Sequence, residues 1–194
     1  MLFRSHMTQA YKVTGIEVSK MVIHAATSRW NKTIYDPYVN MLRTQTEAMS
    51  ASLGGVDSLT VEPFDTVFGE PNEFSERIAR NQQLLLKEEA HFDKVIDPAS
   101  GSYYIENLTH SIVNATWELF LSLEEKGGFL ENLKAGNIQK DIKEGVIRRK
   151  KNINRRKESF LGTTQFPNAT ENLNEKVDLN KALQEKKEEV YEYE

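Results

Sequence analysis

The stretch DPYVNMLRTQTEAMSASLGGVDSLTV, residues 36–61, decides the fold because it joins a helix pattern to a strand pattern. Asp36 before Pro37 is typical of a helix N-cap followed by proline at the first helical position. Gly54-Gly55 supplies a helix stop, and residues 58–61 then predict a short strand. One face of the helix is marked by residues that recur at steps of three and four: Val39, Leu42, Thr46, Met49 and Leu53.

The same order of elements occurs before and after this stretch. Residues 21–23, Met-Val-Ile, predict a strand that ends before the polar pair Thr27-Ser28. Asn72 is a typical cap for a second helix, and residues 94–96 predict a third, minimal strand. Three further helices are expected: one in phase along Leu108, Ile112, Ala115, Leu119 and Leu123 up to Gly127-Gly128, one over residues 129–134, and one from Ile138.

Strands that alternate with amphipathic helices predict an α/β fold with parallel strands joined by right-handed crossovers. Only about three strand-helix units are present, and three strands cannot close a barrel. The open edges would expose unpaired backbone groups. The chain is therefore expected to be the last part of a larger fold, or to need a partner. Residues 168–194 lose the apolar periodicity and predict a charged linker or tail after a domain over residues 1–167.

Composition narrows the class of protein. The chain has 194 residues, 39% hydrophobic and 28% charged, which is typical of a globular domain. It has no cysteine, which excludes disulfides and thiolate metal sites. Neither a membrane-length apolar run nor a signal peptide is recognisable, so we expect a soluble, cytoplasmic protein without a membrane partner.

Charge is unevenly distributed. The net charge is −4, yet residues 143–157 carry eight basic side chains. This run lacks the interleaved aromatic residues that stack on nucleic-acid bases. We therefore expect it to be a solvated face or a subunit contact, with no nucleic-acid partner.

Two longer stretches carry a family resemblance: residues 27–65, with DPY, TEAM and LGG, and residues 74–109, with ERIARN and DPASGSYY. Together they resemble the methylmalonyl-CoA mutase family over about residues 21–168, with the motifs in the family's order. The resemblance implies the last strand-helix units of a (β/α)8 TIM barrel, helix-rich and followed by a linker. It also implies an adenosylcobalamin-dependent isomerase that interconverts the coenzyme A esters methylmalonyl-CoA and succinyl-CoA.

The positions at which this sequence differs from the family pattern indicate one branch of the family. Catalytic chains resemble Arg-x-His-Ser-Gln-Thr-Ser-Gly-Trp at the first strand, where this sequence has Val22, Ala25, Ala26 and Arg29 at four of the positions. At the second strand they resemble Ser-Leu-His-Thr-Asn, whereas this sequence reads Ser-Leu-Thr-Val-Glu over residues 58–62. The resemblance thus implies the small, non-catalytic subunit of a heterodimer, which pairs with a catalytic chain.

The cofactor motif is another departure. The pattern Asp-x-His-x-x-Gly, whose histidine ligates cobalt in the family, does not occur in these 194 residues. The cobalt-ligating domain is accordingly expected to be absent from this chain, which alone should be inactive. No catalytic residue is predicted.

Four residues remain as candidate contacts. Three of them match substrate-facing positions of the family: His24, Thr27 and Ser28. They either still contact substrate or are remnants that line a vestigial cavity. Glu106 matches a glutamate near the adenosyl group, but a glutamate in a first helical turn is also favoured by the helix dipole. Glu88, Glu89 and His91 predict no metal site, because adjacent helix residues point about 100° apart.

Two other interpretations stay open. In the first, the segment belongs to a catalytic acyl-CoA mutase with altered substrate preference. In the second, it is an independent helical interaction module that uses residues 143–157. The residues Val22, Ala25, Ala26 and Thr60 argue against the first. The second predicts a stable monomer that needs no further strands.

Overall fold

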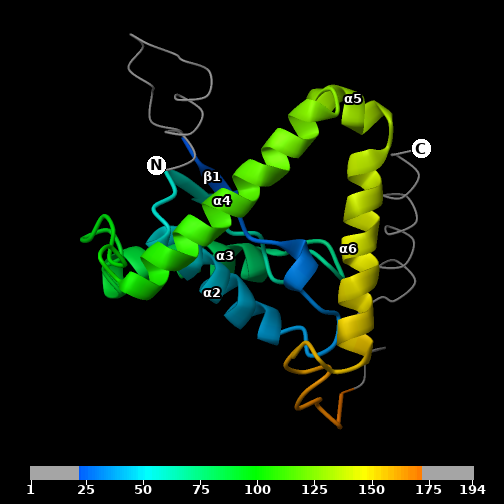
Figure 1. The fold of residues 1–194 in the computed structure, drawn as a ribbon. Coiled ribbons are helices and arrows are strands. Elements are labelled where there is room, and N and C mark those ends of the chain that lie inside the picture. The colour runs from blue at the N-terminus through cyan, green and yellow to red at the C-terminus, as the bar shows by residue number, and fades with distance from the viewer. Residues whose placement is uncertain (1–21, 172–194) are drawn as a thin grey trace. The chain divides into compact units, whose positions relative to one another are not determined.

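The structure, a computed structural model, describes residues 22–171 (Figure 1). These residues divide into two compact units. Residues 22–98 and 158–171 form the strand unit, and residues 99–157 form the helical unit. In the described part of the chain no helix has the length and apolar character needed to cross a membrane.

Two short parallel strands lie at the centre of the strand unit. β1 (His24–Ala26) pairs with β2 (Ser58–Thr60), so that His24, Ala25 and Ala26 lie opposite Ser58, Leu59 and Thr60. The chain between them forms α2 (Val39–Leu53). The strand-helix-strand order predicted from the sequence is confirmed.

The first strand begins later than predicted. We expected residues 21–23, but the ladder starts at His24, and residue 21 lies outside the described residues. Ile23 precedes the ladder and bonds to Asp57 through its backbone. Its amide donates to the Asp57 carboxylate at 3.0 Å, and its carbonyl accepts from the Asp57 amide at 2.9 Å. The register is set by the partner strand, which the apolar run could not indicate.

The start of α2 also differs from the prediction. The helix begins at Val39 with Tyr38 at the cap position, so Asp36 is not the N-cap. Instead Asp36 has a positive φ of 44°, and its carbonyl accepts from the amide of Val39 at 3.0 Å. Asp36 and Pro37 therefore form a turn that leads into the helix. The predicted stop at Gly54-Gly55 is confirmed, with Gly55 at φ +72°.

The face of α2 that faces the core is not the one the sequence pattern marked. The buried residues are Asn40, Thr44 and Ala48, whereas Leu42 is 66% exposed. Thr44 and Gln82 explain the difference, because the Gln82 amide donates to the Thr44 hydroxyl at 3.0 Å. A polar stripe is buried here since its groups bond to one another across two helices.

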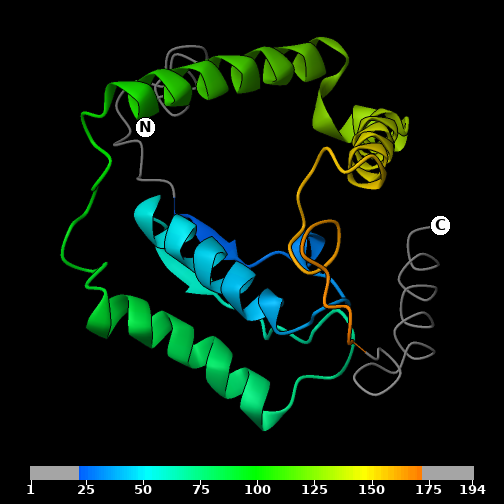
Figure 2. The ribbon, with the colours of Figure 1, turned by 90° about the horizontal axis from the view of Figure 1, so that it is seen from below.

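α3 (Glu73–Leu84) packs against α2, and one π-helical turn (Leu85–Glu89) continues it (Figure 2). The predicted cap at Asn72 is confirmed as a full capping box with Ser75. The small apolar core lies between these helices and the sheet, with Leu59 packed against it. Its buried members are Ala48, Val61, Ala79 and Leu86.

Residues 94–96 do not form the predicted third strand. They lie in a loop with no strand partner among the described residues, and Ile96 is 95% exposed. Two apolar residues after a lysine are too short a signal to specify a strand when no neighbouring strand accepts it. The described sheet therefore has two strands.

Residues 158–171 return to the strand unit and contact the start of α2. Arg43 donates through Nη2 to the Leu161 carbonyl at 2.6 Å, and the Glu171 carboxylate accepts from the Asp36 amide at 2.9 Å. Gly162, at φ +77°, approaches Asp36 so closely that an added Cβ would lie 2.7 Å from the Asp36 Cβ. Glycine is therefore required there for both its backbone angle and its size.

The helical unit contains α4 (Tyr103–Glu125), α5 (Gly128–Lys134) and α6 (Asn137–Asn154), which confirms the three predicted helices. Asn132 is its one fully buried residue, and its side-chain amide donates to the carbonyls of Leu123 and Gly128 at 3.2 and 2.8 Å. The predicted face of α4 is largely exposed. Large apolar side chains on the surface of this unit include Tyr103, Tyr104, Leu108, Ile112, Leu119, Phe129, Leu130, Ile142 and Ile147.

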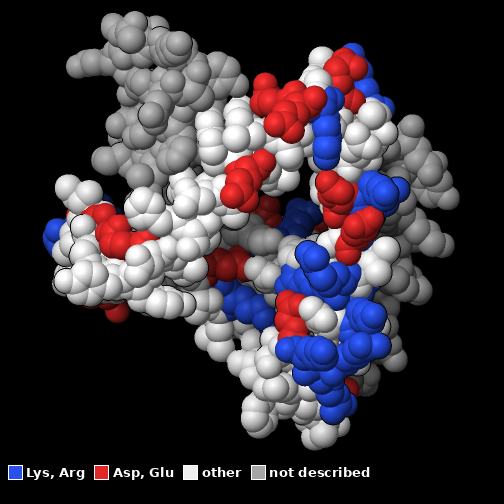
Figure 3. Space-filling view, in the orientation of Figure 1, with Lys and Arg blue, Asp and Glu red and all other residues white. Residues whose placement is uncertain are grey.

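Five of the eight basic side chains of the run lie on α6, and the other three follow the helix at residues 155–157. Figure 3 shows Lys and Arg side chains gathered over the lower part of this helix, with acidic and basic side chains mixed over its upper part and α5. This run is exposed or half-buried along its length.

Candidate functional site

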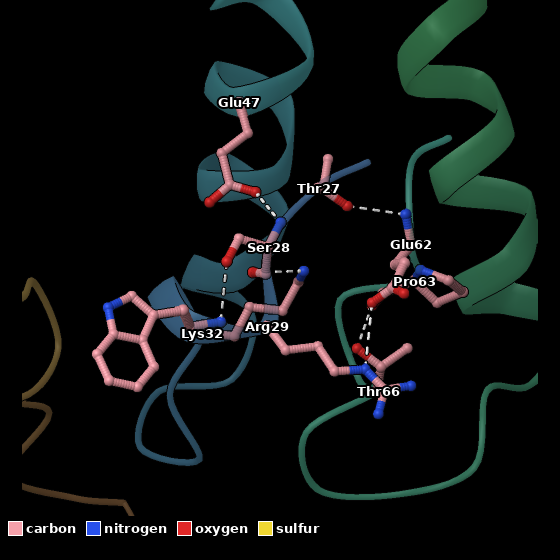
Figure 4. Close-up of polar contacts among 9 residues, drawn as sticks. Thr27, Ser28, Arg29, Lys32, Glu47, Glu62, Pro63 and Thr66 are labelled. Carbon is pink, nitrogen blue, oxygen red and sulfur yellow. Dashed lines mark hydrogen bonds and ion pairs between the residues drawn. The ribbon is translucent and has the colours of Figure 1, made fainter. Parts of the chain in front are cut away.

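Two of the four predicted site residues, Thr27 and Ser28, lie at the carboxyl end of β1 (Figure 4). His24 begins the strand, and Thr27 and Ser28 follow it directly. Because β1 and β2 are parallel, the loop after β2 begins at the same edge of the sheet. The carboxyl ends of parallel strands are where α/β proteins gather their functional side chains.

His24 lies on the sheet face opposite the small core, together with two hydroxyl groups of β2. Its Nδ1 is 2.8 Å from the Ser58 hydroxyl, and its Nε2 is 3.3 Å from the Thr60 hydroxyl. Both ring nitrogens are therefore within hydrogen-bond reach of β2. Thr60 occupies the position where the catalytic pattern has histidine. His24 therefore contacts a residue at which this sequence differs from catalytic chains.

Thr27 extends the pairing of the two strands beyond β1. Its amide donates to the Thr60 carbonyl at 3.1 Å, and its hydroxyl accepts from the Glu62 amide at 2.9 Å. The residue is only 5% exposed. Thr27 thus joins the two loops at the strand ends by two hydrogen bonds.

Ser28 caps a single turn of 3₁₀ helix, η1 (Arg29–Asn31). Its hydroxyl accepts from the Trp30 amide at 3.1 Å, and its own amide donates to the Glu47 carboxylate at 2.9 Å. Asn31 donates to the other carboxylate oxygen at 3.0 Å. Glu47 on α2 therefore holds the whole loop after β1.

A buried lysine, which the sequence analysis did not single out, lies beside these groups. Lys32 is 8% exposed, and its Nζ donates to the Ser28 carbonyl at 3.1 Å. Burial lowers the pKa of Lys32, while the nearby carboxylates of Glu47 and Glu62 act in the opposite direction. Neither Lys32 nor Glu47 carries a local sequence signal beyond its charge, so only the fold reveals their proximity.

An ion pair spans the two loops. Arg29 Nε lies 3.3 Å from a carboxylate oxygen of Glu62, with the Arg29 side chain more exposed than that of Glu62. The loop after β2 is fixed in turn by a hydrogen bond from the Thr66 hydroxyl to the Pro63 carbonyl at 3.1 Å. Arg29 and Glu62 are both positions where the sequence departs from the catalytic pattern.

Glu106, the fourth predicted site residue, lies in the helical unit. It is an exposed residue in the first turn of α4, and its Oε1 accepts from the Gly101 amide at 3.2 Å. Glu106 therefore belongs to a different unit from the other three. Among the described residues no three His, Asp or Glu side chains gather in a way that would hold a metal ion.

These features define the class of protein: a parallel α/β chain whose polar residues gather at the carboxyl ends of neighbouring strands. The family model described as methylmalonyl-CoA mutase matches residues 1–193. The chain belongs to the methylmalonyl-CoA mutase family, which confirms the resemblance seen in the sequence.

Individual relatives also support the small-subunit branch of the family. The chain is 57% identical over 163 residues to the methylmalonyl-CoA mutase small subunit of Porphyromonas gingivalis, a match that covers 84% of this chain and 26% of that protein. It is 43% identical to the small subunit of Streptomyces virginiae, covering 76% of this chain and 24% of that protein.

A relative not described as a small subunit is the methylmalonyl-CoA mutase of Escherichia coli K12. The identity is 39% over 143 residues, or 74% of this chain and 20% of that protein. The chain thus spans about a quarter or less of the length of these relatives. Similarity to small subunits is the higher of the two.

Proposed function

We propose that this chain forms the closing strand-helix units of a (β/α)8 barrel in the small, non-catalytic subunit of a methylmalonyl-CoA mutase. Its role is to pair with a catalytic chain and stabilise it, in the cytoplasm. Residues 1–167 would belong to the barrel and residues 168–194 to the linker that follows. The whole enzyme would be an adenosylcobalamin-dependent isomerase acting on coenzyme A esters.

The observation that carries this proposal is the parallel pair of strands with its crossover helix. β1 and β2 are joined through α2 in the way that barrel units are joined, and the described sheet has open edges. Two parallel strands cannot form an independent barrel, so further strands are needed to cover them. Similarity to small subunits supports the choice of this family's barrel as the larger fold.

Exposed apolar surface points the same way. Leu42 on α2 and a series of side chains on α4, including Ile112 and Leu119, are exposed in the described residues. Exposed apolar side chains along a helix face are typical of surfaces that another part of a protein covers. We attribute them to contacts with the rest of the barrel and with the catalytic chain.

The non-catalytic assignment rests on how the polar residues at the strand ends are used. His24, Thr27 and Ser28 all bond to neighbouring groups of this chain. Such contacts give each residue a structural task at the place where a catalytic chain would contact substrate. We therefore propose that His24, Thr27 and Ser28 are remnants of substrate contacts.

Adenosylcobalamin supplies radical chemistry when it is bound to an enzyme. The described residues do not by themselves fit this cofactor. The one predicted contact, Glu106, is an exposed carboxylate that already accepts the Gly101 amide, and no other predicted site residue lies in its unit. We propose that the cofactor is held by other parts of the assembled enzyme.

The test is association with a catalytic chain. Sedimentation velocity of the full chain, alone and mixed with the catalytic subunit of a bacterial heterodimeric mutase, should show a new, faster species in the mixture. The Leu42→Glu variant should weaken that species, whereas the matched Asn81→Glu variant on the exposed surface of α3 should not. A wild-type chain that remains separate from the catalytic subunit would refute the proposal.

A further inference from the structure

Residues 158–171, here called the strap, are joined to α2 by an arginine. Arg43 donates through Nη2 to the Leu161 carbonyl at 2.6 Å, and its guanidinium carbon lies 5.6 Å from the centre of the Phe160 ring. Attraction between a cation and an aromatic face operates within about 6 Å of the ring centre. Arg43 therefore binds the strap through both a hydrogen bond and an aromatic ring.

The same arginine belongs to the network that holds both strand-end loops. Its Nη1 donates to Asn40 Oδ1 at 2.7 Å and to the Thr33 hydroxyl at 3.1 Å. The Asn40 side chain accepts from the Thr33 amide, in the loop after β1, and donates to the Phe64 carbonyl, in the loop after β2. A chain of direct contacts therefore runs from the strap through Arg43 and Asn40 to both loops.

The strap is the part of this network that opens most easily. Leu161 is 51% exposed and Phe166 is 81% exposed, whereas Asn40 is fully buried. A segment with few buried apolar contacts opens locally at a lower free energy than the core does. Its docking also has a steric condition, because the strap reaches Asp36 only where Gly162 carries no Cβ.

Docking of the strap supplies partners to a half-buried cation. Burial lowers the pKa of Arg43, while the charges of Asp36 and Glu47 act in the opposite direction. A partly buried charge that loses an acceptor is unfavourable, so Arg43 should turn towards water when the strap leaves. That movement breaks its bonds to Asn40 and Thr33 as well.

We propose that the strap is a conformational device: its docking at Arg43 keeps both strand-end loops ordered, and its release loosens them. Ser28 and Lys32 lie in the same loop as Thr33, so the state of the strap also governs the candidate site. Arg43 is a positioning residue in this account, since it acts through Asn40. The inference does not depend on the proposed function, because every contact that it uses lies within the strand unit.

The experiment follows hydrogen exchange at single amides of the full chain by nuclear magnetic resonance. Gly162→Ala should release the strap, because the new Cβ would lie 2.7 Å from the Asp36 Cβ. The reporter is the Thr33 amide, and the internal reference is the amide of Ala48, a buried residue of α2 that reports global unfolding. We expect the Thr33 rate to rise at least about fivefold relative to the Ala48 rate, the lower end of typical coupling between linked sites.

A milder variant decides the matter if Gly162→Ala fails to fold. Phe160→Leu keeps an apolar side chain but removes the ring over which the Arg43 guanidinium lies, so the relative Thr33 rate should again rise. The matched control is Asn72→Ala, which weakens the cap of α3 without touching the strap. A relative Thr33 rate that both strap variants leave unchanged, or that Asn72→Ala raises equally, would overturn the proposal.

A double-mutant cycle tests whether Arg43 carries the coupling. In the Arg43→Gln background the strap and the loops are no longer joined, so adding Gly162→Ala should leave the relative Thr33 rate unchanged. A rise as large as the one that Gly162→Ala causes in wild type would mean that the strap acts on the loop by another route. That result would overturn the positioning role of Arg43.

Discussion

The Asn40→Ala substitution should be among the most damaging single changes in the strand unit. Asn40 is 0% exposed and its side chain joins three segments. The oxygen accepts from the Thr33 amide at 3.0 Å and from Arg43 at 2.7 Å, and the nitrogen donates to the carbonyls of Thr33 and Phe64 at 2.8 and 3.3 Å. These bonds hold both strand-end loops to α2.

The magnitude follows from these contacts. Arg43 keeps other partners after truncation, including the Thr33 hydroxyl and the Leu161 carbonyl, so three bonds are lost without replacement. At about 1 kcal/mol each, the loss is about 3 kcal/mol in the free energy of unfolding. For a denaturation slope of about 2 kcal/mol/M, the urea midpoint should fall by about 1.5 M.

The assay is urea denaturation of the full chain followed by far-ultraviolet circular dichroism. The matched control is Asn81→Ala, because Asn81 is exposed on α3. Alanine favours helix there, so the midpoint of the control should stay constant or rise slightly. An Asn40→Ala midpoint equal to that of the control would refute the argument that these hydrogen bonds hold the loops.

Three more substitutions test other contacts. Asn72→Ala removes the capping box of α3, so we expect a loss of about 1 kcal/mol, measured by urea denaturation, and no loss would contradict the cap. Arg43→Gln releases the Leu161 carbonyl, so the Gly162 amide should exchange faster by nuclear magnetic resonance. The pKa of Lys32 is lowered by burial, so the unfolded chain binds more protons as pH approaches the ordinary value of 10.5. The stability of wild type relative to Lys32→Met should therefore rise from pH 7 to pH 10, and a constant urea-midpoint difference would contradict burial.

The sequence predicted the order of elements better than their packing. The helix stops at Gly54 and Gly127 and the cap at Asn72 follow from backbone rules that act locally, and the structure has them. The face of α2 does not follow from such rules. Its buried residues include Asn40 and Thr44, which are polar and become buried only because distant groups bond to them.

Strand limits were predictable only in part. An apolar run marks where a strand can form, but pairing decides where it does. β1 starts at His24 because β2 offers Ser58–Thr60 as its partner. Residues 94–96 have no such partner among the described residues and remain a loop.

In the candidate site, too, some residues could be predicted from the sequence and others could not. A motif identified His24, Thr27 and Ser28, and the structure places His24 at the start of β1 and the other two directly after its end. Lys32 and Glu47 were missed, since a lysine in a loop and a glutamate on a helix normally face solvent. Only the long-range contact between the loop and α2 identifies them.

Hydrogen exchange by mass spectrometry, on the full chain alone and mixed with a catalytic mutase subunit, tests the central claim most directly. If these residues are barrel units completed by a partner, peptides over β1 and β2 should gain strong protection only in the mixture. Full protection of the same peptides in a lone monomer, with no change on mixing, would contradict the account and favour an independent module.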